Sequence, residues 1–176
     1  MSKSYLAAPR AAKGGELRMY FISMRHLSGI QKGIQSIHAT AVYSNEHGNS
    51  DIWKKWSTED HTVVLLEGNV YSEDGPTSTY NVYYFMELLK IYSVRHSFFR
   101  EPDLSNSFTS VGFILDERFF NSEKYPDKVF EKEEDKFFFY SGYEGSTELS
   151  KEDILEIGFI VYSIRESLKQ FKLASN

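Results

Sequence analysis

The chain of 176 residues contains no cysteine, which excludes disulfide bonds and thiolate metal sites. It also lacks an apolar run long enough to cross a bilayer, and its N-terminus has no secretory signal pattern. These absences favour a cytoplasmic protein that has no membrane among its partners.

Metal-binding patterns are missing as well. The five histidines stand at positions 26, 38, 47, 61 and 96, so none forms a His-x-x-x-His pair or a carboxylate-spaced pair. We therefore expect no metal site, and nothing in the sequence indicates another cofactor.

An excess of positive charge is absent too. The formal net charge is −5; residues 1–118 hold 12 Lys/Arg against 13 Asp/Glu, and residues 119–176 hold 8 against 12. An unselective nucleic-acid binder needs a basic surface that releases counterions from phosphates. The charge balance argues against that class and places the acidic surplus in the C-terminal part.

What is present is enough apolar and aromatic material for one core: 41% hydrophobic residues, with 14 Phe and 12 Tyr. Residues 1–18 show no apolar periodicity and are interpreted as a flexible leader or tag. Residues 19–118 are predicted to form an α/β domain. Residues 119–176 are predicted to form a C-terminal extension packed on the same domain.

The pattern of apolar residues predicts the order of elements. The expected elements are a strand at 19–25, helices at 28–44 and 50–58, a strand at 61–67, a helix at 77–93, strands at 96–100, 109–116 and 136–140, and a helix at 150–172. The continuous apolar run ending at Leu66 is typical of a strand buried on both faces, and it predicts that this strand is the central one. The last helix either packs on the sheet or mediates dimerisation.

The helix at 28–44 carries the first candidate site. Its isoleucines and Ala41 predict a buried stripe formed by Ile30, Ile34, Ile37 and Ala41. A second row, Gln31, Gln35 and His38, repeats the spacing about a third of a turn away. This row is either part of a binding site or a polar flank whose amides tie down neighbouring loops.

The second candidate site is the polar segment between two apolar strands, Arg100 to Thr109. Its polar residues are Arg100, Glu101, Asp103, Asn106 and Thr109. Loops between strands often carry binding groups, but Pro102, Asp103 and Asn106 are also ordinary turn residues. Site and turn are both open interpretations.

Together, the Gly-x-Gln-x-x-His-Ala segment from Gly33 to Ala39 and the later Glu-Pro-Asp-Leu…Thr segment from Glu101 carry a resemblance. Over residues 19–118 the chain resembles the type 2 peptidyl-tRNA hydrolases, and more closely their small phage-encoded relatives. The resemblance implies a three-layer fold, with a mixed four-stranded sheet covered by helices on both faces. The strand at 136–140 and the helix at 150–172 are expected to extend this fold at its C-terminus. It also implies hydrolysis of the ester that joins a peptide to the 3′ end of tRNA, in the host cytoplasm if the protein is viral.

By this resemblance, Gln35 matches the family glutamine, Asp103 or Glu101 the loop aspartate, and Thr109 a loop threonine. Gln35, Asp103 and Thr109 are then the candidate catalytic residues. The candidate ligand-binding residues are Gln31, Lys32, His38, Arg100, Glu101 and Asn106.

The chain departs from the family at its catalytic lysine, whose position one turn before Gln35 is occupied by Gln31. Lys32 is one residue away, a rotation of about 100° around a helix, so it is expected to be misplaced. Three functions remain open: an ester hydrolase, a binder of a nucleotide or tRNA 3′ end without turnover, and a counter-defence protein that binds a host protein. The oligomeric state is expected to be monomer or homodimer.

Overall fold

The computed structural model of the chain describes residues 16–68, 82–120 and 163–174. Its elements are β1 (Leu17–Met24), α1 (Gly29–His47), α2 (Asp51–Lys55), a π-helical turn η1 (Trp56–Asp60), β2 (Thr62–Gly68), α3 (Val82–Ile91), β3 (His96–Glu101), a 3-10 turn η2 (Pro102–Leu104), β4 (Ser107–Asp116), a 3-10 turn η3 (Glu117–Phe119) and β5 (Lys172–Leu173). Residues 163–168 are helical as well. In these ranges no helix is both long and apolar enough to span a bilayer.

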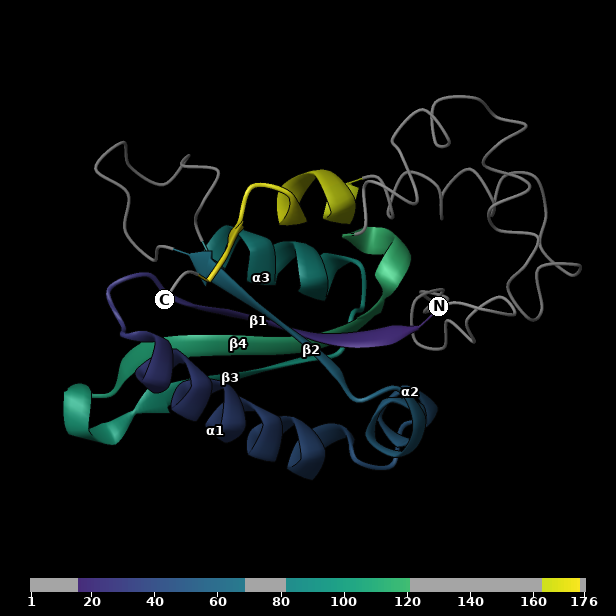
Figure 1. Ribbon diagram of the computed structural model, residues 1–176, viewed down its shortest axis with the longest axis horizontal. Helices are drawn as coiled ribbons and strands as arrows, with labels where there is room; N and C mark the ends of the chain where they lie inside the picture. The colour runs from purple at the N-terminus through teal and green to yellow at the C-terminus, as the bar shows by residue number, and fades with distance from the viewer. Residues whose placement is uncertain (1–15, 69–81, 121–162, 175–176) are drawn as a thin grey trace, which may run out of the picture.

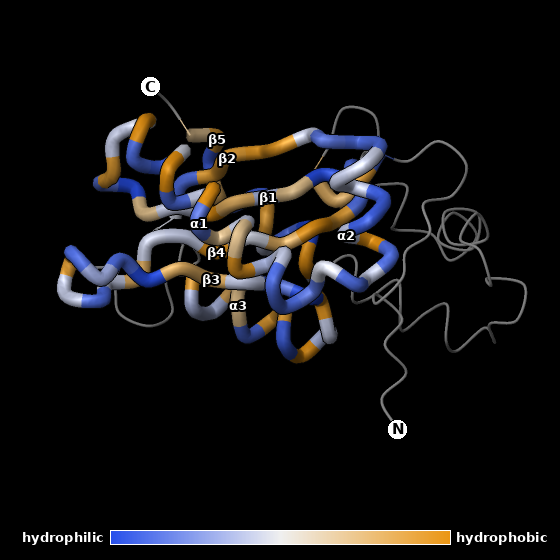
Figure 2. The backbone as a smooth tube through the Cα atoms, turned by 90° about the horizontal axis from the view of Figure 1, so that it is seen from below, coloured by the Kyte–Doolittle hydropathy of each residue, from blue (hydrophilic) through white to orange (hydrophobic). Residues whose placement is uncertain are grey.

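The strands form one mixed sheet in the order β3-β4-β1-β2-β5, which can be followed across Figure 2. The β1–β2 pair is parallel, and the other neighbours are antiparallel. This confirms the predicted α/β class and the mixed sheet. The sheet has five strands rather than the expected four, because β5 adds to the outer edge of β2 at Leu66 and Glu67.

The central strand is β1, so the prediction that the strand ending at Leu66 is central is wrong. β1 pairs with β2 on one side and with β4 on the other along most of its length. Seven of its eight residues are buried. By contrast, Val63 on β2 is 48% exposed, since β5 covers only the end of that strand. Apolar content alone does not distinguish a central strand from the strand beside it.

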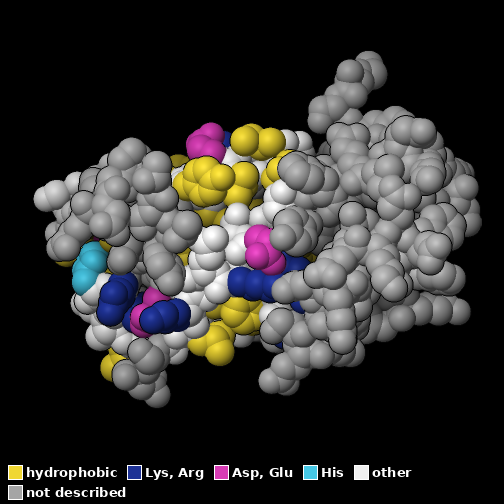
Figure 3. All heavy atoms as spheres, turned by 90° about the horizontal axis from the view of Figure 1, so that it is seen from above, with side chains coloured by type: hydrophobic (Ala, Val, Ile, Leu, Met, Phe, Trp, Pro, Cys, Tyr) yellow, Lys and Arg dark blue, Asp and Glu magenta, His cyan; other side chains and the backbone are white. Residues whose placement is uncertain are grey.

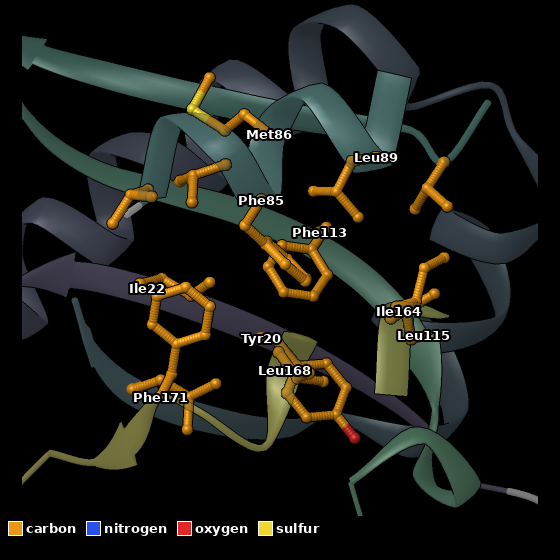
Figure 4. Packing of buried hydrophobic residues seen from close by; sticks show 14 of the residues in the cluster. Tyr20, Ile22, Phe85, Met86, Leu89, Phe113, Leu115, Ile164, Leu168 and Phe171 are labelled. Atoms are coloured by element: carbon orange, nitrogen blue, oxygen red, sulfur yellow. The ribbon is translucent and has the colours of Figure 1, made fainter. Parts of the chain in front are cut away.

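Helices lie on both sides of the sheet: α1 and α2 lie below it in Figure 1, and α3 and residues 163–168 above it. On the α3 side, alternate β1 residues Tyr20 and Ile22 pack with Phe85 of α3 and Phe113 of β4 (Figure 4). The Tyr20 and Phe113 rings stack at 5.7 Å between centroids. On the α1 side the intervening residues Met19 and Phe21 pack with Tyr43 and Trp56.

The C-terminal segment contributes directly to the α3-side core. Three apolar residues of this segment, Ile164, Leu168 and Phe171, are buried in the same cluster as Phe85 (Figure 4). The Phe85 and Phe171 rings meet edge to face at 5.4 Å. For residues 163–174 the structure therefore agrees with the interpretation that the last helix packs on the sheet.

The start of β1 differs from expectation, so residues 17 and 18 of the predicted leader belong to the sheet. β1 begins at Leu17, two residues before the expected start at Met19, and Leu17 is buried. The leader up to residue 15, the strand at 136–140 and residues 150–162 of the last helix lie outside the described residues.

Hydrogen exchange tests the position of β1. Amides of Met19–Phe21 should exchange more slowly than those of Val63–Leu65, because both edges of β1 are hydrogen-bonded and β2 is half-exposed. Mass spectrometry of peptic fragments from the native protein measures both segments. Slower exchange across Val63–Leu65 than across Met19–Phe21 would restore β2 as the central strand.

Candidate functional site

The rotation of α1 about its axis decides what the site contains, and it is opposite to the sequence prediction. Ile30, Ile34 and Ile37 are exposed, and Ala41 is exposed with them. The residues that face the sheet are instead Lys32, Gln35, Ser36, Ala39 and Tyr43. The helix therefore presents its polar side to the sheet near its N-terminus, so the predicted buried stripe is wrong.

Gln35 is the centre of a buried hydrogen-bonded array. Its Nε2 donates to Glu101 Oε2 at 2.7 Å, and its Oε1 accepts from Thr109 Oγ1 at 2.7 Å. The amide therefore uses one end as a donor to a carboxylate and the other as an acceptor from a hydroxyl, which fixes its orientation. Three candidate residues from two distant segments of the chain are thus in contact.

A β-bulge aims Thr109 at this array. The β3–β4 register pairs Phe99 with Ser110 and Arg100 with Phe108, so Thr109 is the extra residue without a partner across the ladder. A bulge bends its strand and redirects a side chain. Thr109 Oγ1 also lies 3.2 Å from the Phe99 carbonyl oxygen. Thr109 consequently points toward α1. The next residue, Ser110, contacts β1, with its Oγ 3.0 Å from Ser23 Oγ.

Lys32 is one turn before Gln35 and lies on the same buried side of α1. Its side chain is 4% exposed, and its Nζ donates to Glu67 Oε1 at the end of β2. A buried cation needs such a partner because leaving it unpaired is costly. The position expected for the family lysine, Gln31, is exposed and completes the capping box of Ser28.

A cleft of ≈ 890 Å³ opens beside this array, at the ends of β1 and β3. Thr109 belongs to both the array and the cleft. The other lining residues come from the end of β1, the start of α3 and the β3–β4 turn: Met24, His26, Tyr83, Arg100, Asp103, Leu104, Ser105, Asn106, Ser107 and Phe108. Four of the eleven lining residues are apolar or aromatic and the other seven are polar or charged, so the cleft is more polar than a typical small-molecule site.

The β3–β4 turn shapes one wall of the cleft. Ser105 and Asn106, which connect η2 to β4, both adopt the left-handed conformation, with φ angles of 53° and 58°. Arg100 ties this turn to α3, because its guanidinium donates to the Asn106 carbonyl oxygen at 3.3 Å and to Tyr83 Oη at 3.1 Å. The guanidinium also lies 5.9 Å from the centroid of the Phe98 ring.

The nine predicted site residues fall into three groups. Gln35, Glu101 and Thr109 are hydrogen-bonded, and Lys32 lies on the same buried side of α1. Arg100, Asp103, Asn106 and Thr109 line the cleft. Gln31 caps the helix, and the exposed His38 ring stacks on Phe99 at 4.5 Å, so these two belong to neither group. Of the two carboxylates weighed for the loop aspartate, Glu101 contacts Gln35, whereas Asp103 is exposed on the turn.

Three residues were not predicted from the sequence: His26 and Tyr83, which line the cleft, and Glu67, which pairs with Lys32. His26 and Glu67 could have been suspected, because each lies at the carboxyl end of one of two parallel strands, where ligands commonly bind. Tyr83 could not have been predicted in this way, because its place in the cleft depends on how α3 packs on the sheet.

Two of the histidines lie close together: His47 Nε2 is 3.3 Å from the His96 carbonyl oxygen. No group of three or more His, Cys, Asp or Glu side chains suited to a metal occurs in the part of the chain that the structure describes. Burial lowers the pKa of His96 below its ordinary value, and its Nδ1 lies 2.9 Å from the Val94 carbonyl oxygen. His96 therefore acts as a neutral packing residue.

No protein-family model and no curated protein sequence matches this chain.

The Lys32–Glu67 pair yields a stability prediction. Lys32→Met should lower the free energy of unfolding by about 3 kcal/mol, because it leaves the half-buried Glu67 carboxylate without its cation. Adding Glu67→Gln should recover a large part of that loss. Urea denaturation of the two variants and the parent measures both effects. An unchanged unfolding midpoint for Lys32→Met would show that the pair does not stabilise the fold.

Proposed function

We propose that this is a peptidyl-tRNA-hydrolase-like protein that holds a nucleotide or the 3′ end of a tRNA in the cleft beside Arg100. We also propose that the fold is the three-layer one that the resemblance implies, with the sheet between two layers of helices. One observation carries it: Thr109 joins the buried Glu101–Gln35–Thr109 array to an open cleft that also contains a guanidinium. A polar array of this kind fixes the groups that meet a ligand.

The cleft has groups suited to each part of a nucleotide. Arg100 uses two of its N–H groups on Tyr83 and Asn106, and a guanidinium has five, so donors remain for a phosphate. Tyr83 is 37% exposed and offers an aromatic surface for a base, supported by the buried Phe108 ring at 5.5 Å between centroids. The Ser105–Ser107 turn supplies hydroxyls for a ribose.

Charge favours a short ligand over a long nucleic acid. On the α3 side of the molecule, Figure 3 shows basic side chains next to acidic ones, with no broad patch of one sign on the described part of that face. Long RNA binding depends on many phosphate contacts. The proposed ligand therefore contacts the protein through its terminal nucleotides.

Ester hydrolysis is the second candidate, favoured by the Glu101 carboxylate beside the glutamine that matches the family. The reaction needs a water aimed at the carbonyl, a base for its proton and donors for the oxyanion. Glu101 could accept the proton. However, the Lys32 ammonium is held by Glu67, and the Thr109 hydroxyl donates to Gln35, so turnover should be slow.

Arg100→Ala tests the binding proposal. The change should raise the Kd for AMP, or for a short RNA ending in CCA, about tenfold or more, since a hydrogen bond to a charged group contributes about 1.5–3 kcal/mol. Isothermal titration calorimetry measures the Kd. The matched control is Lys54→Ala on α2, which removes one exposed positive charge at the opposite end of the molecule (Figure 1). Equal affinity in both variants and the parent, or no binding by the parent, would contradict the proposal.

Release of the peptide from peptidyl-tRNA tests the second candidate. The parent should release peptide slowly or not at all, and Glu101→Gln should not change the amount of nucleotide bound at saturation. A discontinuous assay with labelled peptidyl-tRNA reports the rate. Rapid release by the parent that Glu101→Gln abolishes, with the fold intact by circular dichroism, would make hydrolysis the function.

A further inference from the structure

The outer side of α1 is an exposed apolar stripe. Ile30 is 80% exposed, Ile34 46% and Ile37 69%. At about 100° per residue these three side chains and Ala41 lie within a narrow sector, opposite the buried Lys32 and Ala39. Several large apolar residues gathered on one exposed helix face indicate an interaction site.

The same face carries no formal charge. Among residues 29–45 the only Asp, Glu, Lys or Arg is Lys32, and it is buried against Glu67. The chain as a whole is 26% charged. A solvated helix face normally concentrates charged side chains, so this face is unlike an ordinary water-exposed one.

Gly33 lies at the flank of the stripe, and no contact within the described part of the chain requires a glycine there. A Cβ added at this position would meet nothing within 4 Å. Glycine inside a helix is unfavourable relative to alanine, and its usual use is to let another backbone approach. Because no described part of this chain approaches it, the space is available to a second molecule.

We propose that this face joins two copies of the chain, with the two α1 helices antiparallel across a two-fold axis near Ile34 and Ile37. In a symmetric contact the same patch meets itself, so like charges would face each other across the axis. A charge-free patch avoids that repulsion. A patch for a foreign partner has no such constraint, and charged rims usually give such interfaces their specificity.

The size of the stripe sets the strength of the contact. From Ile30 to Ala41 the helix rises about 16 Å. A standard interface buries about 800 Å² on each partner, which exceeds what one helix face of this length provides. The dimer should therefore be reversible and depend on protein concentration. The stripe faces away from the sheet, so this inference is independent of ligand binding in the cleft.

Sedimentation equilibrium of the full chain tests the proposal from roughly 1 μM to 1 mM, the range that separates moderate from very weak association. The parent should shift from monomer to dimer mass, and the double variant Ile34→Glu/Ile37→Glu should stay monomeric with an unchanged Tm. Ile91→Glu is the matched control, because Ile91 on α3 is 68% exposed, almost the same as Ile37. It should dimerise like the parent.

Cysteine cross-linking tests the geometry, since the chain has no cysteine of its own. Copper–phenanthroline should oxidise an Ile37→Cys variant to a disulfide-linked dimer much faster than an Ile91→Cys variant. A parent that stays monomeric at about 1 mM, or a double variant that dimerises like the parent, would overturn the proposal. Equal cross-linking of the two cysteine variants would overturn the antiparallel arrangement.

Discussion

The two hydrogen bonds of Gln35 determine how α1 lies on the sheet. One reaches Glu101 at the end of β3, and the other reaches Thr109 in the bulge of β4. An amide buried between helix and sheet must have both ends satisfied, because an unpaired buried polar group costs about 1–3 kcal/mol. Only one rotation of the helix does this. That rotation also brings Lys32 to Glu67 and turns the isoleucines outward.

The bulge provides the link between this packing and the proposed function. In a regular antiparallel ladder, Thr109 would have a partner on β3; as an inserted residue, it instead contacts Gln35 while still lining the cleft. The proposed ligand site and the buried array therefore share one residue, the bulged Thr109. The array's donors and acceptors satisfy each other, so the array holds the bulge in place.

Local patterns in the sequence located most elements correctly. The helix predicted at 28–44 and the strands around Ile22 and Phe113 are found close to where the sequence pattern predicted them. The orientation of α1 could not be predicted in this way. Ile30, Ile34 and Ile37 form the more apolar row, and a rule based on hydrophobicity buries it. Gln35 and Lys32 are buried instead because their partners, Glu101 and Glu67, are contributed by other strands far along the chain. The position of β2 beside the centre likewise depends on pairing that apolar content does not encode.

The rotation of α1 can be measured most directly with two neighbouring residues. Ser36 is buried and Ile37 is exposed, and the chain has no other thiol. Single Ser36→Cys and Ile37→Cys variants would be labelled with a thiol reagent under native conditions, in dilute solution that keeps the chain monomeric. Our account predicts that Cys at 37 reacts at the rate of an unfolded peptide, whereas Cys at 36 reacts only on unfolding. Rapid labelling at 36 together with protection at 37 would contradict it.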